Sequence, residues 1–327
     1  ADNVAVGAAA LYLNTTGASN TAVGRSAMIN NTTGANNTAS GYDALRANTT
    51  GSYNIGIGVG AVKANTTGNY NIGVGYFALK TEASGTGNVA MGHASLEDSN
   101  GGNYNTAYGY GSARNTTTGD YNVAVGGYAL DANTTGTENV AVGNNALDSN
   151  TTANNNTAVG MAALQANTTG ANNVGLGSGA LYNNTTASNN TGVGFNSLVS
   201  NTTGADSVGR SALAANTTGA DNTASGHFAL KLNTTGTNNT AVGNLSLDAN
   251  TTGGSNVGIG DNALGGNTTA SSNTAIGGAA LMANTTGATN TAVGAEALRY
   301  NTTGSYSTAV GRRALYANTT GDNNNAF

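Results

Sequence analysis

The sequence predicts an all-β fold, a parallel β-solenoid (β-roll) with one 17-residue repeat per coil. Three observations predict it. A unit of the form N-T-A-V-G-x-x-A-L-x-x-N-T-T-G-x-x fills residues 1–327 in 19 copies. Each copy contains a short stretch of period-two alternation, and nearly every copy closes on polar turn residues. A unit this short cannot bury an apolar face alone, so neighbouring copies must stack on one another.

One glycine marks the same position in every copy, and we call it the anchoring glycine. The step between copies is 17 residues except for 15 residues between Gly194 and Gly209. The whole chain, residues 1–327, is therefore predicted to be a single continuous repeat array. Because no atypical capping copy stands at either end, we expect the array to be a segment of a longer fibre. The anchoring glycines are Gly7, Gly24, Gly41, Gly58, Gly75, Gly92, Gly109, Gly126, Gly143, Gly160, Gly177, Gly194, Gly209, Gly226, Gly243, Gly260, Gly277, Gly294 and Gly311.

The three residues before the anchoring glycine predict a short strand. They read β-branched, small, apolar, as in Thr21-Ala22-Val23, and Asp206 alone breaks the β-branched column. Alternate residues of a strand face opposite sides. We expect Thr21 and Val23 to face a core, and the small residue and the glycine to press against another backbone.

The residues after the anchoring glycine predict a corner and then a second buried segment. Two variable positions, such as Arg25-Ser26, are typical of a solvent-facing corner. The following Ala27-Met28 and its equivalents are predicted to be buried, and either a second short strand or a single helical turn fits them. The closing Asn-Thr-Thr-Gly predicts a tight turn whose glycine has positive φ.

Composition excludes several classes of protein. The chain has no cysteine, so it has neither disulfides nor a thiolate metal site. Charged residues make up 8% of the chain and the net charge is −5, which gives no basic stripe for nucleic acid. No apolar run reaches the roughly 18–20 residues that span a membrane.

The sequence also predicts no enzyme, no cofactor and no metal site. Catalysis needs unlike residues that converge at one place. The two histidines, His93 and His227, lie eight copies apart at the same corner position, which is typical of surface residues. Asp131 and Asp148 occupy one column on successive coils, where a weak cation site is conceivable, but scattered surface acids fit the pattern better.

Asparagine recurs four residues before the anchoring glycine and predicts a structural amide ladder, each side chain bonding to neighbouring coils. This column comprises Asn3, Asn20, Asn37, Asn54, Asn71, Asn88, Asn105, Asn122, Asn139, Asn156, Asn173, Asn190, Asn222, Asn239, Asn256, Asn273 and Asn290.

The asparagine of the closing tetrad fits the N-x-T acceptor for N-glycosylation, since no proline spoils any copy. The other interpretation is a second polar ladder, because sugars stacked about 5 Å apart would be crowded. Both remain open at this stage. Two adjacent copies lack the tetrad, at Glu82 and Ser99. The candidate acceptors are Asn14, Asn31, Asn48, Asn65, Asn115, Asn133, Asn150, Asn167, Asn184, Asn201, Asn216, Asn233, Asn250, Asn267, Asn284, Asn301 and Asn318.

The predicted core is thin, with about four apolar or small residues per coil. Burying them stabilises a coil by less than it costs to order the backbone of 17 residues. Inter-coil hydrogen bonds and burial between chains must supply part of the difference. We therefore predict a homotrimer, with a lone solenoid as the alternative.

The segment Asn20-Thr21-Ala22-Val23-Gly24, with Ala27-Met28, resembles the head repeats of trimeric autotransporter adhesins, whose units read roughly N-S-V-A-I-G-x-x-S-x-A. Longer units ending in N-T-T-G resemble repeat regions of phage-type tail fibres and large bacterial or viral surface proteins. The resemblance covers the whole chain and implies a left-handed, trimeric, extracellular β-roll with Thr21 and Val23 inward. The adhesin unit has about 14 residues against 17 here, which leaves the coil shape open.

These observations predict a structural extracellular fibre or shaft at a cell surface or on a virion. Its partner is itself, as a homo-oligomer or filament. One alternative is an adhesin that binds cell-surface glycans through corners such as Tyr76-Phe77 and His227-Phe228. A further alternative is ice binding by rows of threonine.

Overall fold

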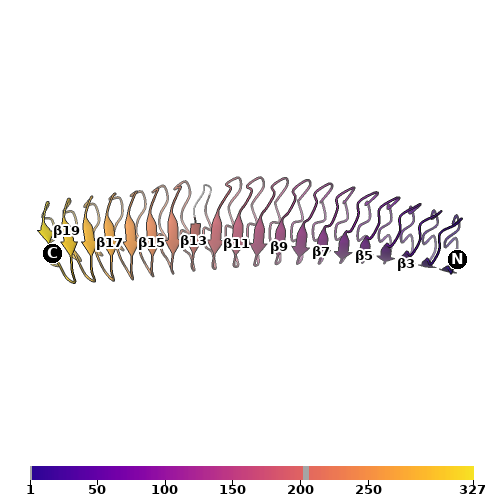
Figure 1. The fold of residues 1–327 in the computed structure, drawn as a ribbon, viewed down its shortest axis with the longest axis horizontal. Helices are drawn as coiled ribbons and strands as arrows, with labels where there is room; N and C mark the ends of the chain where they lie inside the picture. The colour runs from indigo at the N-terminus through magenta and orange to yellow at the C-terminus, as the bar shows by residue number, and fades with distance from the viewer. Residues whose placement is uncertain (1, 202–205) are drawn as a thin grey trace. The chain divides into compact units, whose positions relative to one another are not determined.

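The computed structural model describes residues 2–201 and 206–327, and in them the chain is an all-β solenoid (Figure 1). Parallel coils of about 17 residues stack into about 19 turns, which confirms the predicted fold class. The described residues form strands and turns without any helix. The coils fall into two compact units, unit 1 (residues 1–169) and unit 2 (residues 170–327).

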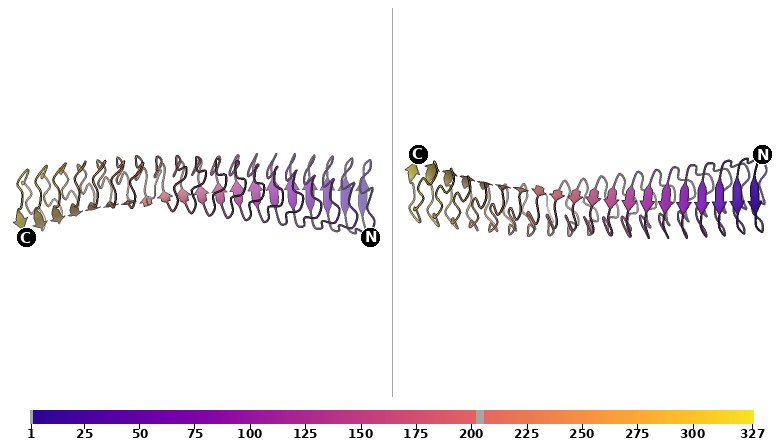
Figure 2. Two further views of the ribbon diagram at one scale, coloured as in Figure 1. Left: turned by 90° about the horizontal axis from the view of Figure 1, so that it is seen from above. Right: turned by 90° about the horizontal axis from the view of Figure 1, so that it is seen from below.

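Each coil of unit 1 contributes one three-residue strand, and consecutive strands pair in parallel with a register of one repeat. Thr21 pairs with Thr38, and Val23 with Ser40. Within the unit the strands lie side by side on one side of the coils (Figure 2). They are β1 (Val4–Val6), β2 (Thr21–Val23), β3 (Thr38–Ser40), β4 (Ile55–Ile57), β5 (Ile72–Val74), β6 (Val89–Met91), β7 (Thr106–Tyr108), β8 (Val123–Val125), β9 (Val140–Val142) and β10 (Thr157–Val159).

Unit 2 repeats the arrangement and absorbs the 15-residue step without a register slip. Thr191 pairs with Asp206, and Val193 with Val208, so the two missing residues belong to the connection and not to the strands. Most of that copy's tetrad lies outside the described residues. The strands are β11 (Val174–Leu176), β12 (Thr191–Val193), β13 (Asp206–Val208), β14 (Thr223–Ser225), β15 (Thr240–Val242), β16 (Val257–Ile259), β17 (Thr274–Ile276), β18 (Thr291–Val293), β19 (Thr308–Val310) and β20 (Asn325–Ala326).

The prediction of which strand residues face the core is wrong. The adhesin resemblance implied the same inward direction for Thr21 and Val23, and it is wrong for the same reason. Ala22 is 0% exposed, whereas Val23 is 39% exposed and Thr21 is half-buried. The small residue therefore points into the coil, and the β-branched residues point out. The cause is lack of space, because a Cβ on Gly73 would lie 2.6 Å from Cγ2 of Val62.

The segment after the corner is buried as predicted, but it is neither a strand nor a helical turn. It is a series of turns in which the leucine column has positive φ, such as 50° at Leu45. Such a backbone costs about 1–2 kcal/mol for an L-residue. Two contacts offset that cost. The leucine side chain is fully buried, and its N–H donates to the carbonyl of Ala61 on the next coil at 3.0 Å.

The two glycine columns are occupied by glycine for different physical reasons. The anchoring Gly24 has a φ of +131°, and a Cβ there would also overlap the backbone of Gly41. The tetrad's Gly34, by contrast, does not have the positive φ that the turn pattern predicts. A Cβ there would lie 2.6 Å from Oδ1 of Asn31 and would overlap the carbonyl oxygen of Gly51, so the column admits nothing larger than alanine, which stands at Ala153, Ala187 and Ala270.

The inward direction of Ala158 and the outward direction of Val159 in β10 can be tested by placing aspartate at each position in turn. Ala158→Asp should lower the free energy of unfolding by about 3–5 kcal/mol, because it places an unpaired charge in the coil. Val159→Asp should change the unfolding free energy of the monomeric chain by less than about 1 kcal/mol, because that side chain lies outside the coil. Denaturant unfolding measures both variants. The inward assignment would be restored if Val159→Asp were the more damaging change.

Candidate functional surfaces

The asparagine column before the strand forms a ladder that joins each coil to the next. The Nδ2 of Asn20 donates to the carbonyl oxygen of Gly34 at 2.8 Å. Its Oδ1 accepts from the backbone N–H of Asn37 at 2.9 Å. The equivalent residues from Asn20 to Asn290 are buried, and Asn3 is half-buried. Both halves of the amide are used, so the side chain substitutes for backbone partners that an irregular coil would otherwise leave unpaired.

The asparagine of the closing tetrad forms a second ladder beside the first. The Nδ2 of Asn31 donates to Oδ1 of Asn14 on the preceding coil at 2.8 Å, and to the carbonyl oxygen of Gly34 at 3.0 Å. The Gly34 carbonyl therefore accepts from both columns, Asn20 and Asn31. This shared acceptor fixes the spacing between the tetrad and the start of the strand in the same copy.

The first threonine of the tetrad adds a third connection. The carbonyl oxygen of Thr32 accepts from the hydroxyl of Thr15 at 2.9 Å. It also accepts from the backbone N–H groups of Thr15, Thr16 and Gly17, at 2.9, 3.1 and 3.3 Å. The threonine pair is thus part of the coil-to-coil bonding, at a half-exposed edge.

The candidate glycosylation residues lie at this second ladder. All are fully buried except Asn14, Asn115 and Asn318, which are half-buried. The nitrogen that would carry sugar is the ladder donor, as in Asn48, whose Nδ2 lies 2.7 Å from Oδ1 of Asn31. In the folded coil, a sugar would have to replace that bond and enter the interior. Asn115 differs, because its copy is offset by one residue and Thr116 takes the buried position.

A buried carboxylate replaces the second ladder where the tetrad is lost. Glu82 stands in the asparagine column and is 0% exposed. Its Oε1 accepts from the N–H groups of Gly85 at 2.5 Å, Gly101 at 3.0 Å and Ser84 at 3.2 Å, and its Oε2 accepts from the hydroxyl of Ser99 at 2.6 Å. The lost tetrads were evident from the sequence, but the function of Glu82 as a buried hydrogen-bond acceptor was not predicted. The feature that could have indicated it is an acidic residue in an otherwise neutral column.

The outer face of the strands is a row of uncovered apolar side chains, which we call the outer sheet face. In each strand the third residue is exposed or half-buried, as with Val23, Ile57 and Val242. The first residue beside it is threonine, valine or isoleucine in nearly every copy. No charged side chain occupies this face in the described strands β1–β12 and β14–β19.

Aromatic residues form stacks along the coils of unit 1. Tyr53 lies against Tyr70 with ring centroids 5.1 Å apart, and His93 lies between Tyr76 and Tyr110 at 5.1 and 4.9 Å. Rings stacked along the coil axis cover one another's faces. The edges, the hydroxyl groups and the outer faces of the end rings are left for solvent, and Tyr53 and Tyr70 are both exposed.

The aromatic corners suggested for glycan binding contact cations and rings of their own coil. The ammonium of Lys80 lies 4.4 Å from the ring centroid of Phe77, and that of Lys231 lies 4.3 Å from Phe228. The ring of His227 also stacks on Phe228 at 3.8 Å. Because a sugar packs on an open ring face, these corners offer poor platforms for one.

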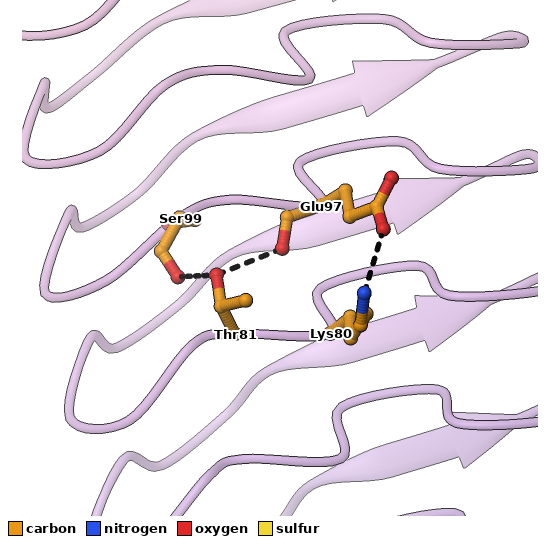
Figure 3. A network of polar contacts seen from close by, with 4 residues as sticks. All are labelled: Lys80, Thr81, Glu97 and Ser99. Carbon is orange, nitrogen blue, oxygen red and sulfur yellow. Dashed lines mark hydrogen bonds and ion pairs between the residues drawn. The ribbon is translucent and has the colours of Figure 1, made fainter.

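One position of the repeat, five residues after the anchoring glycine, carries a charged residue on successive coils of unit 1. We call this position the charged column, and the side of the coils on which it lies the turn side. Ion pairs join neighbouring coils, such as Lys80 to Glu97 at 3.1 Å and Arg114 to Asp131 at 2.8 Å. Figure 3 shows the first pair, beside which the Thr81 hydroxyl lies 2.8 Å from the carbonyl oxygen of Glu97. The column comprises Arg46, Lys63, Lys80, Glu97, Arg114, Asp131 and Asp148.

Two carboxyl groups of this column have raised pKa values. Burial raises the pKa of Asp131, the Arg114 charge opposes that shift, and the neighbouring Asp148 charge adds to it. Burial likewise raises the pKa of Asp148, against the charge of Arg114 and a hydrogen bond from Gln165. Among the described residues, no group of three or more His, Asp or Glu could hold a metal ion.

No protein-family model matches the chain, and no curated protein matches its sequence. In the described part of the chain, no helix is long and apolar enough to cross a membrane.

The bonding of Glu82 predicts a graded response to substitution. Glu82→Ala leaves three N–H groups without their acceptor and should lower the free energy of unfolding by about 3–5 kcal/mol. Glu82→Gln keeps one acceptor oxygen and should cost about half as much. Chemical denaturation measures both. Equal, small losses would show that the carboxylate is not the structural acceptor.

The raised pKa of Asp148 predicts a pH-dependent gain from Asp148→Asn. A raised folded-state pKa contributes stability that is present below the unfolded value, near 3.8, and is lost as the pH rises through the folded value. The variant should therefore match the parent near pH 3 and exceed it in melting temperature at pH 7. Asp221→Asn, on an exposed corner, controls for the change in net charge. A variant that is less stable at pH 7 would contradict the assigned cause.

Proposed function

We propose that the chain is a structural shaft, a segment of an extracellular fibre on a cell surface or a virion. One observation carries the proposal. The inter-coil bonds of asparagine, threonine and strand repeat from coil to coil, while the corner residues vary freely. Repeated identical bonding provides length and stiffness, and it places no demand on any one coil.

The outer sheet face supports self-association of the shaft. The trimer was predicted from the thin core and from small residues expected to press against another backbone, but those residues face the inside of the coil. The exposed valine and isoleucine row now takes their place, because soluble monomers seldom leave long contiguous apolar patches uncovered. The trimer and the left-handed coil are proposed from the resemblance to adhesin head repeats.

Ice binding is a second candidate, favoured by strands β15–β19. All ten outward residues there are β-branched, so their rotamers are restricted, and they mix threonine hydroxyls with methyl groups. Successive coils are about 4.8 Å apart. Tetrahedral water with oxygen atoms about 2.75 Å apart has second neighbours about 4.5 Å apart. The spacing of the coils is therefore close to the second-neighbour oxygen distance of ice, and the β-branched rows keep this spacing over five coils.

Sedimentation equilibrium tests the shaft proposal. We expect an oligomer at micromolar concentration, which a Val242→Lys/Ile276→Lys variant should dissociate because lysine in the row places charges in the contact. The control is Met161→Lys/Ala295→Lys, at exposed corners. A parent chain that stays monomeric would overturn self-association. If that monomer also inhibits ice recrystallisation, and Thr274→Lys abolishes the inhibition, the second candidate replaces the shaft.

A further inference from the structure

A cavity of about 490 Å³ lies on the turn side of unit 1, away from the outer sheet face. Its walls carry Arg46, Lys63 and Lys80, which stand at one column position on three successive coils. The chain has ten lysines and arginines in all, so three of them share this one groove. Cations on successive coils are about 4.8 Å apart at their backbones.

The groove has room because its floor is built from small residues. Ala47 and Ala64 follow the cations Arg46 and Lys63, so no large side chain fills the space between the charged heads. Asn30 lies at one end and Thr81 at the other, and both bear groups that hydrogen-bond to hydroxyls.

The counter-charges lie deeper than the cations. The Asp43 carboxylate is paired with Lys63 at 3.0 Å and with Arg46 at 3.7 Å. The Asp43 side chain is 7% exposed, against 35% for Lys63 and 50% for Arg46. One carboxylate thus serves two cations, and the excess positive charge faces the groove.

The third cation is balanced by a neighbour that a ligand could displace. Lys80, which lines the groove, pairs with Glu97 on the next coil at 3.1 Å (Figure 3). Both side chains are partly exposed, so the pair is weak and exchangeable. An incoming anionic group would compete with Glu97 for the same ammonium.

We propose that this groove binds the carboxylate or sulfate groups of an acidic polysaccharide lying along the charged column. Anionic substituents on neighbouring sugars would reach cations on different coils, and sugar hydroxyls would meet Asn30 and Thr81. This partner goes beyond the proposed shaft function and does not depend on it.

The same observations disfavour a nucleic acid in this groove. No aromatic side chain lines it, so bases have no stacking platform. The uncompensated charge is about one unit, since Asp43 and Glu97 neutralise two of the three cations, whereas nucleic-acid affinity depends on many phosphate contacts.

Titration calorimetry of the full chain tests the proposal, with dextran sulfate, polygalacturonate and neutral dextran as probes. We expect dextran sulfate, polygalacturonate or both to bind with an affinity that falls as salt rises, and neutral dextran not to bind. Binding of dextran sulfate alone assigns the ligand as sulfated, and binding of polygalacturonate alone assigns it as carboxylated. Tighter binding of single-stranded DNA than of either would overturn the polysaccharide assignment.

Matched variants locate the site. Lys80→Gln should weaken binding about tenfold. The control is Lys231→Gln, which has the same column position and the same contact with a phenylalanine ring but no cation at that column position on either neighbouring coil. Glu97→Gln should strengthen binding, because it removes the competitor for Lys80, and a merely structural pair would not give that gain. Equal losses from both lysine variants, or weaker binding by Glu97→Gln, would overturn the proposal.

Discussion

The fold depends on buried asparagine amides that bond one coil to the next. A three-residue strand satisfies few backbone groups, and the rest of each coil is made of turns. Asn20 and Asn31 fill that deficit from two sides and meet at the carbonyl oxygen of Gly34. Buried polar groups stabilise a fold only when they are paired, and here both donor and acceptor of the amide are used. The thin apolar core can be tolerated because this network supplies the missing order.

Much of the fold could be predicted from the 17-residue period of the sequence. The rest depended on how much space is available for each side chain inside the coil. The 17-residue step fixed the positions and register of strands such as β2 and β3, and it located the asparagine column. Period-two alternation, however, says only that Ala22 and Val23 face opposite sides. The inside is decided by the space next to leucine and the turn carbonyls, which admits alanine and excludes valine. The positive φ of Leu45 was equally hidden, because it depends on a tertiary contact.

The candidate sites were also predictable only in part, because the repeat period gives the column of a residue but not its contacts. Stacking at a fixed period predicts that Arg46, Lys63 and Lys80 share a column, because one residue per coil returns to the same edge. Sequence cannot show that Asp43 reaches under two of them, since it stands at a different position of its copy. The contacts of the aromatic corners were also hidden. Tyr76 stacks on His93 of the next coil, and Phe77 contacts Lys80 of its own coil.

Glu82 shows what a repeat requires when it departs from its own pattern. The substitution introduces a buried charge, which would be costly if it were isolated. Three of the residues that bind it, Ser84, Ser99 and Gly101, are themselves departures from the tetrad pattern, and the fourth, Gly85, is the pattern's own glycine. Ser99 provides a hydroxyl, and Ser84, Gly85 and Gly101 direct their N–H groups at the carboxylate. The ladder is therefore replaced as a group and not residue by residue. At Glu82 the buried polar side chain therefore keeps its partners although its identity has changed.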